Sequence, residues 1–206
     1  MKTLKTLLFL LSVMAFSAAY GSETLDALRQ KADALHAEGK NDSAVIVAEK
    51  ALAEAVSRGD TTAIVGVNSS LGVYLRTMGK LDEALERYGE AMKLCTTEAY
   101  RRRAGEDARQ EAAVLYLNLA ILHVDMQHKE QAAYYARMCA DWAGRCADKE
   151  FKAQVMAQDG LVFLMCGDNK QAARLLSEAY GYAVDVKQYD SALSAAAYMV
   201  AVSDRL

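Results

Sequence analysis

The chain has 206 residues, of which 53% are hydrophobic and 25% are charged, so it is neither a disordered chain nor a collagen-like one. It holds no proline and only 12 glycines, which favours helices and disfavours turn-rich sandwiches and barrels. The formal net charge of −3 argues against a dedicated nucleic-acid binder, and no nucleic-acid partner is expected. The composition therefore predicts an all-α protein and indicates no particular reaction.

Residues 1–22 have the layout of a secretory signal peptide. Two lysines precede an apolar run at residues 7–16, and small residues follow it. The run is shorter than the roughly 20 apolar residues of a membrane-spanning helix, which favours export with cleavage over a membrane anchor. We therefore expect an exported protein, periplasmic or secreted, with one repeat domain at residues 23–206.

The remainder of the chain repeats one pattern, in which two apolar stretches with helical spacing are joined by a short polar turn. Three of the turns contain glycine where a left-handed residue ends a helix: Gly39, Gly79 and Gly167. Since neither helix of a pair can bury its apolar face alone, the pairs must stack. The expected units are residues 25–60, 61–100, 106–148 and 149–188, followed by an extra helix at residues 189–206.

The second unit shows the repeat most clearly in its series of large and small residues: Leu71, Gly72, Leu75, Gly79, Ala84, Tyr88 and Ala91. On these residues the chain resembles the tetratricopeptide repeat (TPR) family, and the resemblance covers about residues 24–206. Unit three departs from the family pattern with Gln127 for the turn glycine, and unit four has Asp159 where leucine is expected. The resemblance implies a right-handed α-solenoid of stacked helix-turn-helix hairpins. An unrelated bundle of alanine-rich helices is the alternative.

Side chains that often carry chemistry form no recognised catalytic or metal-binding motif. His123 and His128 are five residues apart, which is not the spacing that places two ligands on one helix face. His123 takes an interior position of the repeat, and His128 lies in the turn. The acidic pair Glu106–Asp107 falls at a predicted helix start, where the helix dipole favours negative charge. We therefore expect no enzyme, no metal and no cofactor.

The cysteines and the single tryptophan are expected to serve packing. Cys95, Cys139, Cys146 and Cys166 are interpreted as small buried residues. A Cys146–Cys166 or a Cys95–Cys139 disulfide is the alternative after export. Trp142 is expected to pack between units.

Two segments lie outside the regular pattern. Eight extra residues separate units two and three and include the basic run Arg101–Arg103, which is typical of a solvated helix end. The extra helix at residues 189–206 is almost entirely apolar between Ala192 and Val202. It either caps the stack or leads into a chain that continues beyond Leu206.

In the resembled family, the first helices of the units line a concave groove. The matching positions of units one and two are Asp26, Arg29, Asp33, His36, Ser69, Val73, Arg76 and Thr77. Those of units three and four are Val114, Leu117, Ile121, Val124, Asp125, Gln154, Ala157, Leu161, Leu164 and Met165. Asn118 is added as a polar group that can bond a peptide backbone. The groove is thus expected to be polar toward the amino terminus and apolar toward the carboxyl terminus.

From these positions we predict a partner-binding groove that consists of Arg76, Val73, Leu117, Asn118, Ile121, Val124, Leu161, Leu164 and Met165. Its apolar half suits a hydrophobic peptide or an amphipathic helix. The alternative is that its leucines and Ile121 are covered by the superhelix itself or by residues absent from the chain. Related domains that bind the acidic tails of chaperones use lysine, asparagine and arginine on successive first helices. The groove positions of this chain do not supply that combination.

The function expected from this resemblance is a non-enzymatic scaffold that presents its groove to a protein or peptide partner in the cell envelope. The alternative is the amino-terminal, extracytoplasmic sensor domain of a membrane-anchored bacterial regulator. Its output module is not in this chain, and it would meet a membrane only through residues beyond Leu206.

Overall fold

The computed structural model describes residues 24–103 and 105–203, and the predicted signal peptide at residues 1–22 lies outside them. Across the described residues the regular secondary structure is helical throughout. The helices in chain order are α2 (Leu25–Ala37), α3 (Asn41–Arg58), α4 (Thr61–Thr77), α5 (Leu81–Cys95), α6 (Glu98–Arg103), α7 (Glu106–Asp125), α8 (Lys129–Gly144), α9 (Lys149–Cys166), α10 (Asn169–Asp185) and α11 (Tyr189–Ser203). None of these helices is long and apolar enough to cross a membrane.

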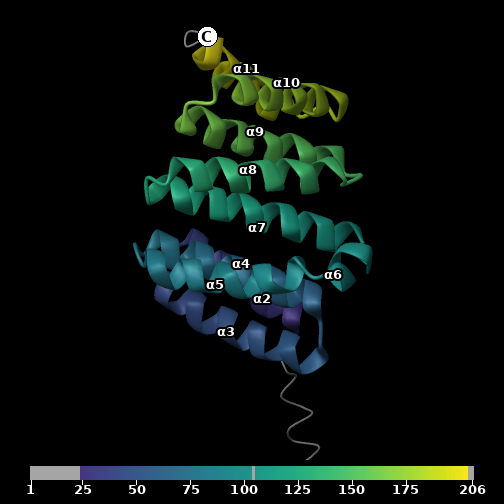
Figure 1. The fold of residues 1–206 in the computed structure, drawn as a ribbon. Coiled ribbons are helices and arrows are strands. Elements are labelled where there is room, and N and C mark those ends of the chain that lie inside the picture. Colours follow the sequence, from purple (N-terminus) through teal and green to yellow (C-terminus); the bar gives the residue numbers. More distant parts are fainter. Residues whose placement is uncertain (1–23, 104, 204–206) are drawn as a thin grey trace, which may run out of the picture.

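Consecutive helices pair into hairpins, and the hairpins stack along one axis (Figure 1). The pairs are α2–α3, α4–α5, α7–α8 and α9–α10, and α11 packs against α10. The short helix α6 occupies the extra residues between units two and three, where Arg102 is exposed and pairs with Glu98 at 2.5 Å. The fold is therefore the predicted all-helical α-solenoid.

A left-handed residue ends the first helix of each hairpin. Gly39, Gly79 and Gly167 have φ angles of 77°, 77° and 88°, as their place in the repeat predicts. The corresponding residue after α7 is Gln127, and Lys187 takes the same conformation after the second helix α10; each has a φ angle of 62°. A side chain at a left-handed position costs free energy that glycine avoids. These two turns are therefore less favourable than the three that contain glycine.

Small residues let the two helices of a hairpin approach closely. The alanines that mark the second helices have no exposed surface: Ala44, Ala84, Ala132 and Ala172. A Cβ atom on Gly72 would overlap the ring of Tyr88, and one on Gly160 would lie 2.8 Å from Cγ of Leu176. The small residues of the repeat thus mark the places where two helices touch.

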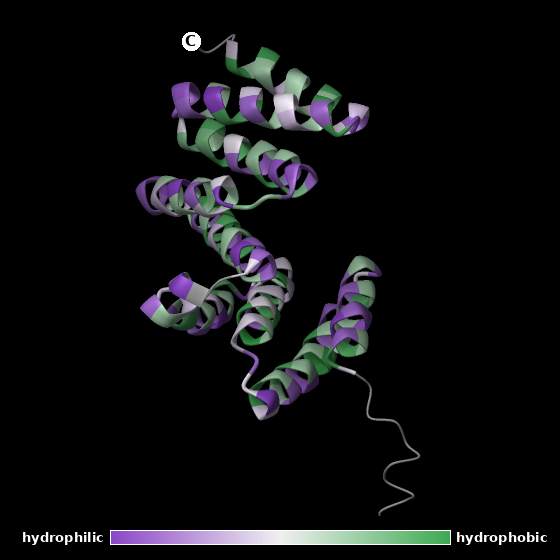
Figure 2. Ribbon diagram, turned by 90° about the vertical axis from the view of Figure 1, so that its right-hand side faces the viewer, coloured by the Kyte–Doolittle hydropathy of each residue, from purple (hydrophilic) through white to green (hydrophobic). Residues whose placement is uncertain are grey.

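The buried side chains form two main clusters that meet at α4. Leu71 and Tyr74 belong to the cluster of α2–α4, while Val65 belongs to the larger one, which runs on to α11. Figure 2 shows hydrophilic residues along the outer faces of the stack and a largely hydrophobic α11 at its end. Leu193 and Val200 of α11 are 72% and 63% exposed. This helix thus leaves one apolar face uncovered within the described part of the chain.

The burial of the cysteines agrees with their interpretation as packing residues. Cys95, Cys139 and Cys146 are buried, Cys166 is half-buried, and none of the four forms a disulfide bond in the described structure. Burial raises the pKa of Cys139 and raises that of Cys146 to about 11. These two thiols are therefore neutral and poor nucleophiles at physiological pH.

Candidate partner-binding cleft

A cleft of about 890 Å³ lies at the amino-terminal ends of α2, α4 and α7, which are the first helices of three successive units. Phe151, in the first turn of α9, extends its lining toward the fourth unit. The volume falls within the range of about 300–1,000 Å³ that is usual for ligand sites. The cleft is the candidate functional site because side chains from four helices converge on it.

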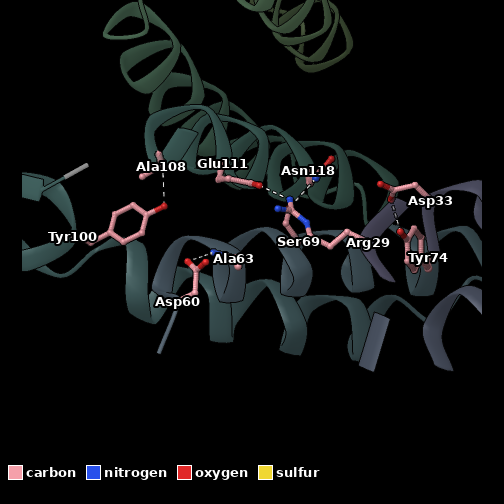
Figure 3. Close-up of polar contacts among 10 residues, drawn as sticks. All are labelled: Arg29, Asp33, Asp60, Ala63, Ser69, Tyr74, Tyr100, Ala108, Glu111 and Asn118. Atoms are coloured by element: carbon pink, nitrogen blue, oxygen red, sulfur yellow. Dashed lines mark hydrogen bonds and ion pairs between the residues drawn. The ribbon is translucent and has the colours of Figure 1, made fainter. Parts of the chain in front are cut away.

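The connection between units two and three shapes this cleft. It leads through α6 to Gly105, a lining residue that directly precedes α7. The Tyr100 hydroxyl donates to the carbonyl oxygen of Ala108 at 3.0 Å, as Figure 3 shows. The Tyr100 ring also meets that of Trp142 edge-on, with centroids 6.5 Å apart. Trp142 is buried as predicted, and α6 is anchored against the helix that forms one wall of the cleft.

An ion pair between the first and third units crosses this cleft. Arg29 of α2 donates to Glu111 of α7 at 2.5 Å (Figure 3). Burial opposes the charge on Arg29, but the carboxylates of Glu111, Asp33 and Asp26 together outweigh it, so the pKa of Arg29 is raised. Gly66 of α4 makes room for this pair, because a Cβ atom there would overlap the Glu111 carboxylate. The pair therefore depends on a glycine of the helix that lies between its partners.

Two further carboxylates of the cleft accept hydrogen bonds from backbone amides. Asp60 caps α4, since its Oδ1 accepts from the amide of Ala63 at 3.0 Å. Glu106 lies in the first turn of α7, as the sequence predicts, but its Oε1 accepts from the amides of Ala147 and Asp148 at 2.7 and 3.1 Å. Glu106 therefore ties the start of α7 to the connection that precedes α9.

The remaining acidic residues of the cleft face solvent. Asp26 and Asp107 are exposed and lie in the first turns of α2 and α7. Neither makes a hydrogen bond or ion pair with the described residues, although Asp26 contributes to the field around Arg29. Leu25, Val114 and Phe151 add apolar surface between them. The cleft thus combines an acidic rim with apolar walls.

Polar contacts also join the first helices farther along their length. The Asn118 amide donates to Oγ of Ser69 at 3.0 Å, and Tyr74 donates to Asp33 at 2.5 Å (Figure 3). Arg76 pairs with Asp125 at 2.8 Å. Two residues of the predicted groove, Arg76 and Asn118, therefore hold α4 to α7 in this structure.

The other predicted groove residues are mostly packed into the stack. Leu117 is only 4% exposed, so little of its side chain is available to a partner in this structure. Four more are half-buried against the core: Val73, Ile121, Val124 and Leu164. Leu161 is half-buried as well. Met165 is 60% exposed. The burial of Leu117 favours the alternative that the superhelix itself covers apolar positions of the first helices.

None of the nine predicted groove residues lines the cleft. They lie in the later turns of α4, α7 and α9, whereas the cleft opens at the amino-terminal ends of α2, α4 and α7. Of the wider set of groove positions, Asp26, Arg29 and Val114 do line it. Sequence reasoning missed the acidic residues at the start of α7, which it interpreted only as helix-start charges. The one available signal was the eight-residue insertion just before them.

The described residues hold no group of three or more histidine, cysteine, aspartate or glutamate side chains that could bind a metal. His123 is buried and His128 is exposed, as predicted, and their ring centroids are 5.7 Å apart. Burial and the neighbouring His128 lower the pKa of His123. The cleft itself offers carboxylates, one guanidinium and apolar surface, which are groups suited to binding.

Comparison with solved structures supports the fold. BtubC from P. vanneervenii aligns with a TM-score of 0.59 and 18% identity over 79% of this chain and 64% of its own. This chain thus spans somewhat less than two thirds of BtubC. A thermophilic TPR protein from Thermus thermophilus aligns with a TM-score of 0.50 and 18% identity, over 88% of this chain and 92% of that one. No family profile and no curated protein sequence matches this chain.

These likenesses define the class of the protein by its fold. The chain is an α-solenoid of TPR-like hairpins, in agreement with the resemblance that its second unit shows. At 18% identity, the likeness concerns the fold and not the residues of a site. The function must therefore be argued from the cleft of this chain.

Proposed function

We propose that the protein is a non-enzymatic interaction module that binds a segment of a partner protein in the cleft between α2, α4 and α7. The observation that carries the proposal is the convergence of three first helices on one preformed cleft. Solenoids of stacked hairpins characteristically use such extended concave surfaces for binding. The likeness of the fold to a TPR protein supports the same class of function.

The walls of the cleft are held by contacts within the chain. Arg29 and Glu111 join the first unit to the third, and Asn118 joins α7 to Ser69 of α4. Little ordering entropy is lost when a partner binds to walls that are already fixed. Preorganisation of this kind favours tight binding of a partner.

We further propose that the protein acts in the cell envelope, on the strength of the signal-peptide pattern in residues 1–22. The alternative role as a sensor domain has one supporting observation. Leu193 and Val200 of α11 leave an apolar face on which a further element could pack. Fractionation of cells that express the chain tests the location: recovery in the envelope or the medium supports it, and recovery with cytosolic proteins contradicts it.

Site-specific photocrosslinking in cells tests the interaction role. A photoreactive amino acid replaces Val114, which lines the cleft, or Val184, an exposed valine on α10. We expect a defined protein adduct from position 114 and none from position 184. Equal adducts from both positions, or none from position 114, would contradict binding in the cleft.

A further inference from the structure

The lining of the cleft is strongly acidic, although the chain as a whole is nearly balanced. Five carboxylates contribute to it against one guanidinium: Asp26, Asp60, Glu106, Asp107, Glu111 and Arg29. The whole chain has 27 acidic and 24 basic residues. A concave surface with charge of one sign focuses the field and attracts ligands of the opposite sign.

We propose that the segment bound in this cleft is basic: an extended stretch of a partner protein rich in arginine and lysine. This inference rests on the proposed interaction role and specifies the chemistry of the partner. An acidic tail or a nucleic acid would meet repulsion from the same carboxylates, which excludes both as occupants of the cleft.

The rim offers carboxylates that no group of the described chain neutralises directly. Asp60 and Glu106 are engaged with backbone amides, and Glu111 is engaged with Arg29. Asp26 and Asp107 remain exposed at two sides of the cleft, in the first turns of α2 and α7. A guanidinium or ammonium group of the partner can therefore bind them without breaking a contact of the solenoid.

The apolar walls suit the stems of the same side chains. Leu25, Val114 and Phe151 lie among the carboxylates of the lining. Arginine and lysine place their methylene groups on apolar surface while the charged end reaches polar groups. The half-buried ring of Phe151 adds a face on which a guanidinium can stack. Acidic rim and apolar walls together match long basic side chains better than a small inorganic cation.

The internal pair Arg29–Glu111 shows this chemistry within the chain itself. Arg29 enters the cleft from α2 and is bound there by a carboxylate of α7, under the additional influence of Asp26 and Asp33. A carboxylate can accept more than one donor. We infer that a partner's arginine binds beside Arg29, in the same field and in the same manner.

The experiment measures binding of two labelled peptides to the full chain by fluorescence anisotropy. One peptide alternates arginine and leucine, and the other replaces each arginine by glutamate. We expect binding of the arginine peptide only, with an affinity that falls as salt is raised, because exposed charges are screened over about 10 Å at 0.1 M salt. Equal binding of both peptides, or binding of neither, would overturn the proposal.

A pair of matched variants places the binding site. Asp26→Asn with Asp107→Asn should weaken the arginine peptide at least about fivefold and flatten its salt dependence. Asp42→Asn with Asp190→Asn is the control, since both residues are exposed and also lie in the first turns of their helices, α3 and α11. An equal loss of affinity in both double variants would contradict a site in the cleft.

The outcomes separate this inference from the proposed function. If the glutamate peptide binds and a photoreactive residue at Val114 still captures a protein, the cleft binds partners but the basic segment is wrong. If position 114 captures nothing and neither peptide binds, both proposals fail.

Discussion

Asp159 places an ionisable carboxyl group in the buried core of the stack. It stands where the TPR pattern has leucine, and it is fully buried on α9 with neither carboxyl oxygen hydrogen-bonded within the described structure. Burial raises its pKa to about 8, and the positive charge of Arg174 on α10 opposes this rise. Its charge would also affect Cys139 on α8. Asp159 is therefore held in the neutral form at physiological pH.

The proton that the folded chain keeps on the Asp159 carboxyl group makes stability depend on pH. The folded chain keeps it up to about pH 8, whereas the unfolded chain releases it near the ordinary value of 3.8. The free energy of unfolding should therefore fall as pH rises between these two values and level off above about pH 8. Urea unfolding at a series of pH values should show a shallower fall for Asp159→Asn than for the original chain. Identical slopes would contradict the buried neutral carboxyl.

Asp159→Leu restores the residue of the repeat pattern. It should raise the free energy of unfolding at pH 8 by about 2 kcal/mol, because a buried carboxyl without a partner costs about that much. Asp42→Leu, on an exposed position of α3, is the control and should change stability by less than about 0.5 kcal/mol. A destabilised Asp159→Leu chain would show that the carboxyl has a partner which stabilises it.

The sequence flagged Asp159 only as a departure from leucine. Its burial followed from the repeat position, but its lack of a hydrogen-bond partner depends on which side chains of α8 and α10 face it. For Leu117, the position in the repeat did not predict the burial that the structure shows. Its family position indicated a groove, yet the long first helices of this chain pack it into the core, where it is 4% exposed.

At the scale of the elements, the turns were predictable because they depend on local chemistry. Glycine at positions 39, 79 and 167 indicated left-handed helix ends, and the structure has them there. The placement of α6 was not predictable from periodicity, since a helix of six residues contains less than two turns. The cleft forms beside this connection, at the amino-terminal ends of the first helices, whereas the groove predicted from the sequence lies in their later turns.

The turn after α7 offers a test of this local chemistry. Gln127→Gly should raise the free energy of unfolding by about 0.5–1 kcal/mol, because glycine adopts the left-handed conformation without the steric cost of a side chain. Gly79→Ala, at the equivalent turn, should lower it by about 1 kcal/mol. Thermal and urea unfolding measure both. A less stable Gln127→Gly chain would contradict the assigned turn.

At the scale of the whole molecule, one ion pair joins two units that are not neighbours in the stack. In a solenoid each unit contacts its neighbours, but Arg29 and Glu111 pair across 82 residues and join unit one to unit three. Both side chains are partly shielded, with 34% and 20% of their surface exposed. The pair therefore couples the two walls of the cleft directly.

A double-mutant cycle measures this coupling. Glu111→Gln should lower the free energy of unfolding by about 1 kcal/mol, which is more than Glu178→Gln, whose exposed pair with Arg174 lies within one helix. In a Gly66→Ala background the added Cβ displaces the Glu111 carboxylate, so Glu111→Gln should then be nearly neutral. An equal effect of Glu111→Gln in both backgrounds would contradict the bridging role of the pair.

Hydrogen–deuterium exchange with the arginine–leucine peptide tests most directly whether the cleft is the binding site. The first amides of a helix lack intrahelical partners, so contact with a ligand at helix starts slows their exchange measurably. We expect slower exchange at the starts of α2, α4 and α7 and no change in α10 and α11. Protection confined to the later turns of α4, α7 and α9, or to α10 and α11, would contradict it.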